Sequence, residues 1–159
     1  MFLAIVFIGC NTMDNKKFVE IYGNSDFSAF KNTSMFIRDN DIINGDEIIF
    51  AYDGAIPSSL NNGAYVITMD NKKEVIRKTS CHLMKDSTIA DKKKLERLAL
   101  QFIKYPIGNL SVDSNNNVLI SLRANTSTDL IRFSDTKYKH PKYDTWVQIK
   151  DNWYKNKIR

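Results

Sequence analysis

The 159-residue sequence is poor in the residues that build most metal and cofactor sites. It has only two cysteines and two histidines, and the histidines, His82 and His140, lie far apart. A closed zinc site needs four nitrogen or sulfur ligands at short spacings, so the composition argues against one. The sequence also lacks a glycine-rich phosphate loop, a Gly-x-Ser-x-Gly motif and a His-Glu-x-x-His motif. We therefore predict no cofactor, no metal site and no catalytic residue.

The adjacent pair Cys81 and His82 does not change this prediction. Neighbouring residues of a strand point to opposite faces, so the imidazole of His82 could not activate the thiol beside it. The chain also has only three prolines, no low-complexity linker and no repeat at a fixed period. With 43% hydrophobic and 26% charged residues, its composition is that of one globular domain.

One uncharged apolar run stands out, and it lies at the start of the sequence. It extends from Phe2 to Gly9, ends at Cys10 and is followed by a polar stretch that contains the first charged residue, Asp14. The run is too short for a transmembrane helix, which needs about 20 apolar residues to cross the hydrocarbon core. What remains is a targeting signal or a buried strand.

The pair Gly9-Cys10 after this run resembles the end of a bacterial lipoprotein signal peptide. In that family a small residue precedes the cysteine, which is acylated and becomes the mature N-terminus. The resemblance implies a signal peptide at 1–9, lipidation of Cys10, a tether over 10–17 and one domain over 18–159. It also implies a cell-envelope protein anchored in a membrane, facing the periplasm or the cell surface.

Two features of the segment depart from the lipoprotein pattern. Phe7 stands where an aliphatic residue is usual, and no positive charge precedes the apolar run. A start codon upstream of Met1 would explain the missing charge. The alternative is that Phe2–Ile8 is a buried first strand and Cys10 a core residue. A disulfide between Cys10 and Cys81 would then become possible, whereas lipidation leaves Cys81 alone.

The clearest secondary-structure signal is a helix over residues 89–105. Its apolar residues recur at the spacing of one buried helical face, and Pro106 then ends it. They are Leu95, Leu98, Ala99, Phe102 and Ile103. A second helix over 26–36 is a weaker expectation, because its apolar spacing is irregular.

Most of the remaining sequence is typical of short strands joined by tight turns. Three hairpins are expected around the turns at 70–73, 113–117 and 150–152, where Asp and Asn tolerate positive φ. Short connections require antiparallel neighbours. The predicted fold class is therefore α+β, a mainly antiparallel sheet packed against the helix at 89–105. The expected strands cover 47–52, 65–68, 75–78, 110–112, 118–122, 130–133, 146–149 and 153–155.

The net charge of +5 comes entirely from the last part of the chain. Residues 132–159 hold eight basic and three acidic residues, whereas residues 1–131 are balanced, with 15 of each. The same segment contains both tryptophans. Because Trp, Tyr and Arg dominate binding hot spots, we predict a partner-binding surface on the last hairpin, centred on Trp153. Its residues are Trp146, Lys150, Trp153, Tyr154 and Lys155.

These features favour a non-enzymatic envelope lipoprotein that binds a macromolecule, such as an accessory subunit or an immunity-type protein. The closing Asn152-Trp153-Tyr154 strand resembles that of small uncharacterised bacterial lipoproteins over about residues 104–155. The partner would be an envelope protein or an anionic envelope component, and an envelope location disfavours nucleic acid. A lysine-dressed edge hairpin whose aromatic rings close the core would explain the same residues without a partner.

Two other function classes remain open. A helix over an antiparallel sheet can leave a pocket, so a periplasmic small-molecule or glycan-binding module is one of them. A hydrolase built from dispersed carboxylates such as Asp53 is the other. The loop over 53–63 carries an acid, serines and asparagines that could bind a ligand, but Asp-Gly and Asn-Asn-Gly are also ordinary turn chemistry.

Overall fold

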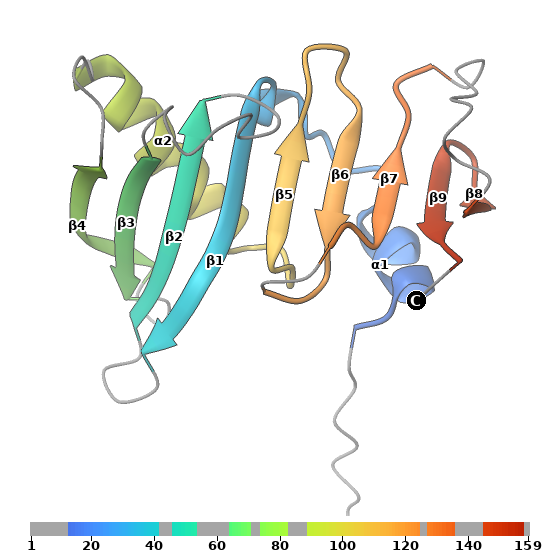
Figure 1. The fold of residues 1–159 in the computed structure, drawn as a ribbon, viewed down its shortest axis with the longest axis horizontal. Coiled ribbons are helices and arrows are strands. Elements are labelled where there is room, and N and C mark those ends of the chain that lie inside the picture. Colours follow the sequence, from blue (N-terminus) through green and yellow to red (C-terminus); the bar gives the residue numbers. More distant parts are fainter. Residues whose placement is uncertain are drawn as a thin grey trace, which may run out of the picture.

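The computed structural model describes residues 13–41, 46–53, 64–70, 74–82, 89–124, 127–135 and 145–157. Within these ranges the chain forms two α-helices, one 3-10 helix and a nine-stranded sheet (Figure 1). The helical segments are α1 (Asn15–Tyr22), η1 (Ser28–Phe30) and α2 (Ile89–Phe102). The strands are β1 (Thr33–Asp41), β2 (Asp46–Asp53), β3 (Ala64–Asp70), β4 (Val75–His82), β5 (Asn109–Val112), β6 (Val118–Ser121), β7 (Leu130–Arg132), β8 (Trp146–Lys150) and β9 (Trp153–Asn156).

The strands are antiparallel throughout and lie in the order β4-β3-β2-β1-β5-β6-β7-β9-β8. The prediction of a mainly antiparallel sheet is therefore confirmed. The three expected hairpins are β3–β4, β5–β6 and β8–β9. Asn116 in the β5–β6 turn and Asp151 in the β8–β9 turn adopt φ of 63° and 49°. Asn and Asp occupy this left-handed region more readily than most residues, so the turn chemistry fixed these connections.

The expected helix over 26–36 is wrong. Only Ser28–Phe30 is helical there, and β1 starts at Thr33 after Asn32, whose φ of 56° interrupts a right-handed helix. From Thr33 onward the side chains alternate between the two faces of the sheet. Thr33 and Met35 are fully buried beneath the helices, which is the period-two pattern of a strand.

The two α-helices only partly match the helices that the sequence predicted. Helix α2 ends at Phe102, and three backbone hydrogen bonds continue the chain in turns as far as Tyr105, just before Pro106. Helix α1 was not predicted. It begins at Asn15 and so occupies the last part of the segment that we expected to be a tether over 10–17.

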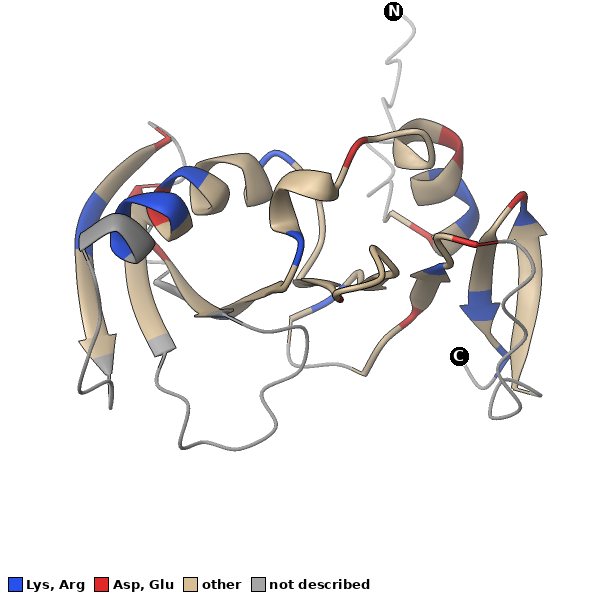
Figure 2. Ribbon diagram, turned by 90° about the horizontal axis from the view of Figure 1, so that it is seen from above, with Lys and Arg blue, Asp and Glu red and all other residues tan. Residues whose placement is uncertain are grey.

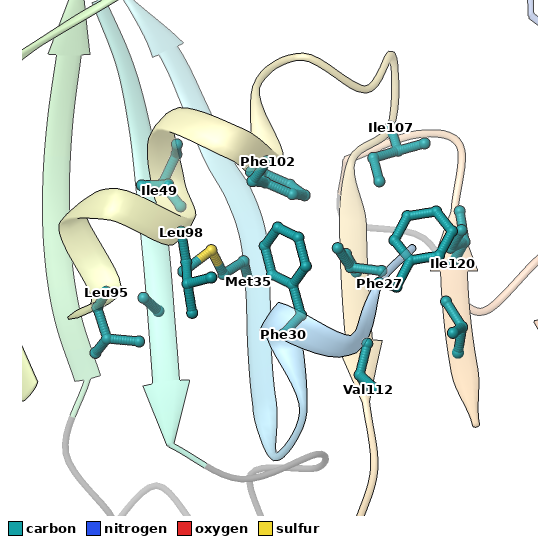
Figure 3. Packing of buried hydrophobic residues seen from close by; sticks show 14 of the residues in the cluster. Phe27, Phe30, Met35, Ile49, Leu95, Leu98, Phe102, Ile107, Val112 and Ile120 are labelled. Atoms are coloured by element: carbon teal, nitrogen blue, oxygen red, sulfur yellow. The ribbon is translucent and has the colours of Figure 1, made fainter. Parts of the chain in front are cut away.

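The helices cover one face of the sheet, and the core lies between the two layers (Figure 2). Figure 3 shows Leu95, Leu98 and Phe102 of α2 directed toward Met35 and Ile49 of the sheet. Each fully buried side chain of this size contributes about 1.5–3 kcal/mol relative to an exposed one. The core cluster also extends under η1 and α1 to the far end of the sheet, where it includes Leu130 and Trp153.

One carboxylate of the sheet is half-buried and gives a pH-dependent prediction. Burial raises the pKa of Glu47 above its ordinary value of 4.5, because the ionised form loses hydration. Below pH 4.5 the carboxyl group is protonated in both the folded and unfolded states. As the pH rises through 4.5 the unfolded state loses its proton first, so the free energy of unfolding decreases until the folded group has also ionised.

We therefore expect Glu47→Gln to raise the melting temperature at about pH 7 and to leave it unchanged at about pH 3.5. Glu20→Gln on α1, where the side chain is exposed, is the matched control. Thermal unfolding followed by circular dichroism at both pH values makes the comparison. An equal shift at both pH values would show that burial of the Glu47 charge has no part in the difference.

Candidate functional site

The end of the sheet formed by β8 and β9 is covered by helix α1. The helix starts at Asn15 because the carboxylate Oδ1 of Asp14 accepts the backbone N–H of Lys17 at 2.8 Å. This contact satisfies one of the N–H groups that a helix leaves unpaired at its first turn. Phe18 and Val19 are then buried against the sheet. The position of α1 beside β9 brings two segments from opposite ends of the sequence together (Figure 1).

Trp153 connects α1 to the sheet, and its side chain is buried. Its side chain is 2% exposed, and its indole Nε1–H donates to the carbonyl oxygen of Gly23 at 3.0 Å. Its ring meets those of Phe18 and Phe27 edge-on, with centroids 6.2 and 6.5 Å apart. The predicted partner-binding surface therefore cannot be centred on Trp153, because the ring already fills the core of this chain.

The other four predicted residues do not form one surface either. Trp146 and Tyr154 are half-buried and lie on the face of the sheet away from α1, where the Tyr154 ring packs edge-on against Phe133 at 5.3 Å. Lys150 and Lys155 are exposed. Lys155 points to the α1 side of the sheet, and Lys150 is the residue of β8 that pairs with Trp153 of β9. Of the five predicted residues, only the two lysines are exposed.

Arg132, which belongs to the same basic segment, also serves the core. Its guanidinium carbon lies 5.1 Å from the ring centroid of Phe27 and 5.5 Å from that of Trp153. One nitrogen donates to the carbonyl oxygen of Ser25 at 2.9 Å. Burial lowers the pKa of the guanidinium, and the nearby Asp26 opposes that shift. The basic character of the exposed surface at this end therefore comes from lysines.

A groove of about 530 Å³ lies between the start of α1 and the last hairpin. We call it the hairpin groove. Three of its lining residues come from the first turn of α1, three are consecutive residues of β8 and one belongs to β9. They are Asp14, Asn15, Lys16, Val147, Gln148, Ile149 and Lys155.

The lining combines aliphatic surface with two ammonium groups. Val147 and Ile149 supply the aliphatic part, and Lys16 and Lys155 supply the charges. The carboxylate of Asp14 already accepts a helix N–H, while the buried amide oxygen Oδ1 of Asn15 accepts no hydrogen bond from the described residues. Buried polar atoms normally have a partner, so a bound donor would satisfy this oxygen. Such a groove suits a ligand that is partly apolar and carries negative charge.

Several of the predicted candidates lie outside the described residues. They are Cys10, His140 and the greater part of the loop over 53–63. Cys81 is an exposed free thiol on β4, at the end of the sheet opposite the hairpin groove, and it pairs with Tyr65 in the register. Among the described residues, no group of three or more His, Cys, Asp or Glu side chains could hold a metal ion.

Apart from Lys155, the sequence analysis missed the groove residues, because their sequence signals are weak or indicate other structures. Asp14 is a good helix-capping residue followed by the short apolar pair Phe18 and Val19, but a polar neighbourhood favoured a tether. Val147 alternates with charged and polar residues, as an exposed edge strand should. Nothing in the spacing of Asp14–Lys16 and Val147–Ile149 indicates that they share one groove.

No helix in the described part of the chain is long and apolar enough to span a membrane. Comparison with known proteins gives no assignment: the chain matches no protein-family model, no curated protein and no solved structure. Any function must therefore be argued from the hairpin groove and the sequence.

Proposed function

We propose that the chain is a non-enzymatic bacterial envelope lipoprotein, anchored through Cys10, that binds a macromolecular partner at the α1 and β8–β9 end of its sheet. The observation that carries the binding part is the hairpin groove, with its aliphatic floor and its two flanking lysines. Charge arranged around an apolar contact area favours encounter with an oppositely charged partner. The anchor rests on the apolar run that ends in Gly9-Cys10.

The proposed anchor is close to the groove residues in the sequence. Cys10 precedes Asp14 by four residues, and an extended chain spans at most about 3.6 Å per residue, so the lipid would lie within about 15 Å of Asp14. The groove would therefore be held close to the membrane surface. A partner bound there would be an envelope protein or another component that is accessible at that depth.

A combined membrane experiment tests this proposal. The full-length chain, expressed in bacteria from an upstream start, should partition with membranes and carry a lipid-sized increase in mass. Cys10→Ala should lose both properties, whereas Cys81→Ala, which changes the exposed thiol of β4, should keep them. A soluble wild type with Met1 retained and no added mass would contradict the anchor.

The same membranes test the binding surface. Chemical cross-linking should yield a discrete adduct that Lys155→Glu reduces by at least about fivefold, since reversing one interfacial charge costs about 1 kcal/mol or more. Lys78→Glu is the control, because Lys78 is exposed on β4 at the other edge of the sheet. An adduct that both variants reduce equally would place the partner elsewhere.

The volume of the groove favours one second candidate, a small-molecule or glycan-binding module. Ligand sites usually occupy about 300–1,000 Å³, and the groove falls within that range at about 530 Å³. A thermal shift of the wild type with cell-wall fragments, absent from Lys155→Glu, would favour this candidate. It would also place the ligand at the same end of the sheet.

A further inference from the structure

Strand β8 ends the sheet, and no described strand pairs with its outer side. The hydrogen-bond pattern shows which backbone groups face outward. The N–H of Lys157 donates to the carbonyl oxygen of Thr145, so residues 145 and 147 face β9 in the β8–β9 register. In antiparallel pairs, backbone groups alternate between the two sides. The N–H and C=O of Gln148 therefore point to the open edge.

Tyr154 of β9 is paired with Gln148 in the register, but its backbone N–H and C=O point toward β7. The N–H of Phe133 donates to the carbonyl oxygen of Asn152, and the N–H of Asn156 donates to that of Asp129. Residues 152, 154 and 156 of the β9 segment therefore face β7. Among the described strands, the backbone of Gln148 therefore has no partner, in agreement with the alternation along β8.

The hairpin groove runs along this edge. Val147 pairs with Lys155 in the register, so both side chains point to the α1 face, where the start of α1 closes the groove. Val147, Gln148 and Ile149 line the groove as consecutive residues of the edge strand, and Val147 is 38% exposed. The groove therefore borders the open edge of β8, where the outward backbone groups of Gln148 lie.

The charge around the edge selects the kind of strand that can bind. Lys16 and Lys155 line the groove, and Lys150 is exposed at the end of β8, beyond a register shift between Gln148 and Lys150. These three cations outnumber the two nearby carboxylates, Asp14, which caps α1, and Asp151 in the turn. A second copy of this chain would bring its own Lys150 to the same edge and would be repelled. An extended segment with acidic side chains would instead pair its charges with these lysines.

We infer that β8 accepts an extended acidic peptide segment of a partner protein as an additional strand. The backbone of the peptide would pair with Gln148, and its acidic side chains would reach Lys16 and Lys155. Strand addition of this kind takes affinity from main-chain hydrogen bonds and specificity from side chains at alternate positions. The inference deepens the proposed function by naming the partner chemistry at the hairpin groove.

The test uses the full-length chain and two short capped peptides, one with Glu alternating with Thr and one with Lys in place of Glu. Amide hydrogen exchange and chemical shifts are followed by nuclear magnetic resonance up to about 1 mM peptide. We expect the Glu peptide to slow exchange of the Gln148 amide and to shift β8 resonances. We expect the Lys peptide to do neither.

Variants separate backbone pairing from charge. Gln148→Pro removes the outward N–H but no bond to β9, and proline is tolerated at such edge positions. Its affinity for the Glu peptide should be about tenfold lower than that of Gln148→Ala, which keeps the N–H. Lys155→Gln should weaken binding about twofold to fivefold, and Lys78→Gln on β4 should not. If Gln148→Pro does not fold, the inference is tested by amide exchange in the wild type and by the comparison of Lys155→Gln with Lys78→Gln.

Three results would overturn the inference. The first is an exchange rate of the Gln148 amide that the Glu peptide does not change. This result counts whether the peptide saturates chemical-shift changes elsewhere or causes none. The second is a dimer, detected by sedimentation, that Gln148→Pro abolishes, because a second copy would then occupy the edge. The third is binding of phosphatidylglycerol vesicles, but not of the Glu peptide, that depends on Lys155. None of these readouts uses Cys10, so failure of the anchor and failure of strand addition are distinguishable.

Discussion

Replacing Trp153 with alanine is expected to lower the free energy of unfolding by about 3–5 kcal/mol, the usual cost of removing a large buried aromatic side chain. The ring is almost completely buried between Phe18 and Phe27, and its indole N–H satisfies the carbonyl oxygen of Gly23. The variant leaves both a cavity and an unpaired carbonyl. The stacked guanidinium of Arg132 also loses one of its two ring partners.

Urea unfolding followed by far-ultraviolet circular dichroism measures this loss. Trp153→Phe should recover part of it, since it restores ring volume but not the hydrogen bond to Gly23. Trp146→Ala is the matched control: it removes the other tryptophan, which is half-buried, and should cost clearly less. Equal losses for Trp146→Ala and Trp153→Ala would mean that Trp153 does not hold α1 to the sheet.

Gly108→Ala is expected to destabilise the fold by about 3 kcal/mol, the upper part of the usual range for overpacking. A Cβ at this position would collide with the backbone atoms of Arg123 and Ala124. Backbone atoms cannot rotate away as a flexible side chain can. The glycine is also fixed on both sides, because its N–H donates to Ser121 at 2.8 Å and its carbonyl accepts from Ile37 at 2.9 Å.

The same urea titration applies to Gly108→Ala, with Asn115→Ala as the control. Asn115 is an exposed residue in the β5–β6 turn, where substitution should change stability by about 0.5 kcal/mol or less. If Gly108→Ala also lies within about 0.5 kcal/mol of wild type, the chain must have room to move at residues 123 and 124. The close approach described for Gly108 would then be wrong.

The hairpins were predictable because their determinants are local. In the β5–β6 turn, the Oδ1 of Asp113 accepts the backbone N–H groups of Asn115 and Asn117, both at 2.8 Å. A short polar side chain and its neighbours are enough to specify such a turn. Alternation of apolar residues then sets the two strands that leave it.

Helix α1 could not be predicted in the same way. It has eight residues, and isolated helices shorter than about 12–15 residues are marginal in water. Its stability comes from packing of Phe18 against Trp153 and from the cap of the Trp153 indole on Gly23, 130 residues away in the sequence. Contacts at that separation leave no local pattern.

For the site, the sequence predicted a binding surface on the last hairpin centred on Trp153, whose ring instead lies in the core. An aromatic side chain suits both a binding hot spot and a core, and only the position of α1 shows that Trp153 belongs to the core. Lys150 and Lys155 remain exposed as predicted residues of the surface. The groove residues at the start of α1 lie beside Lys155 only because the two ends of the chain meet, and the sequence does not show that contact.

The contact between β1 and β5 has a consequence for how the sheet assembles. Each half of the sheet, β1 to β4 and β5 to β9, is built from strands close in sequence, whereas β2, β3, β4 and α2 separate β1 from β5 along the chain. Between β1 and β5, the hydroxyl of Ser111 donates to that of Ser34, 77 residues away, at 2.9 Å. Closing so long a loop has an entropic cost that local hairpins avoid. We therefore expect the hairpins within each half to form before β1 joins β5 and before α1 packs against β9.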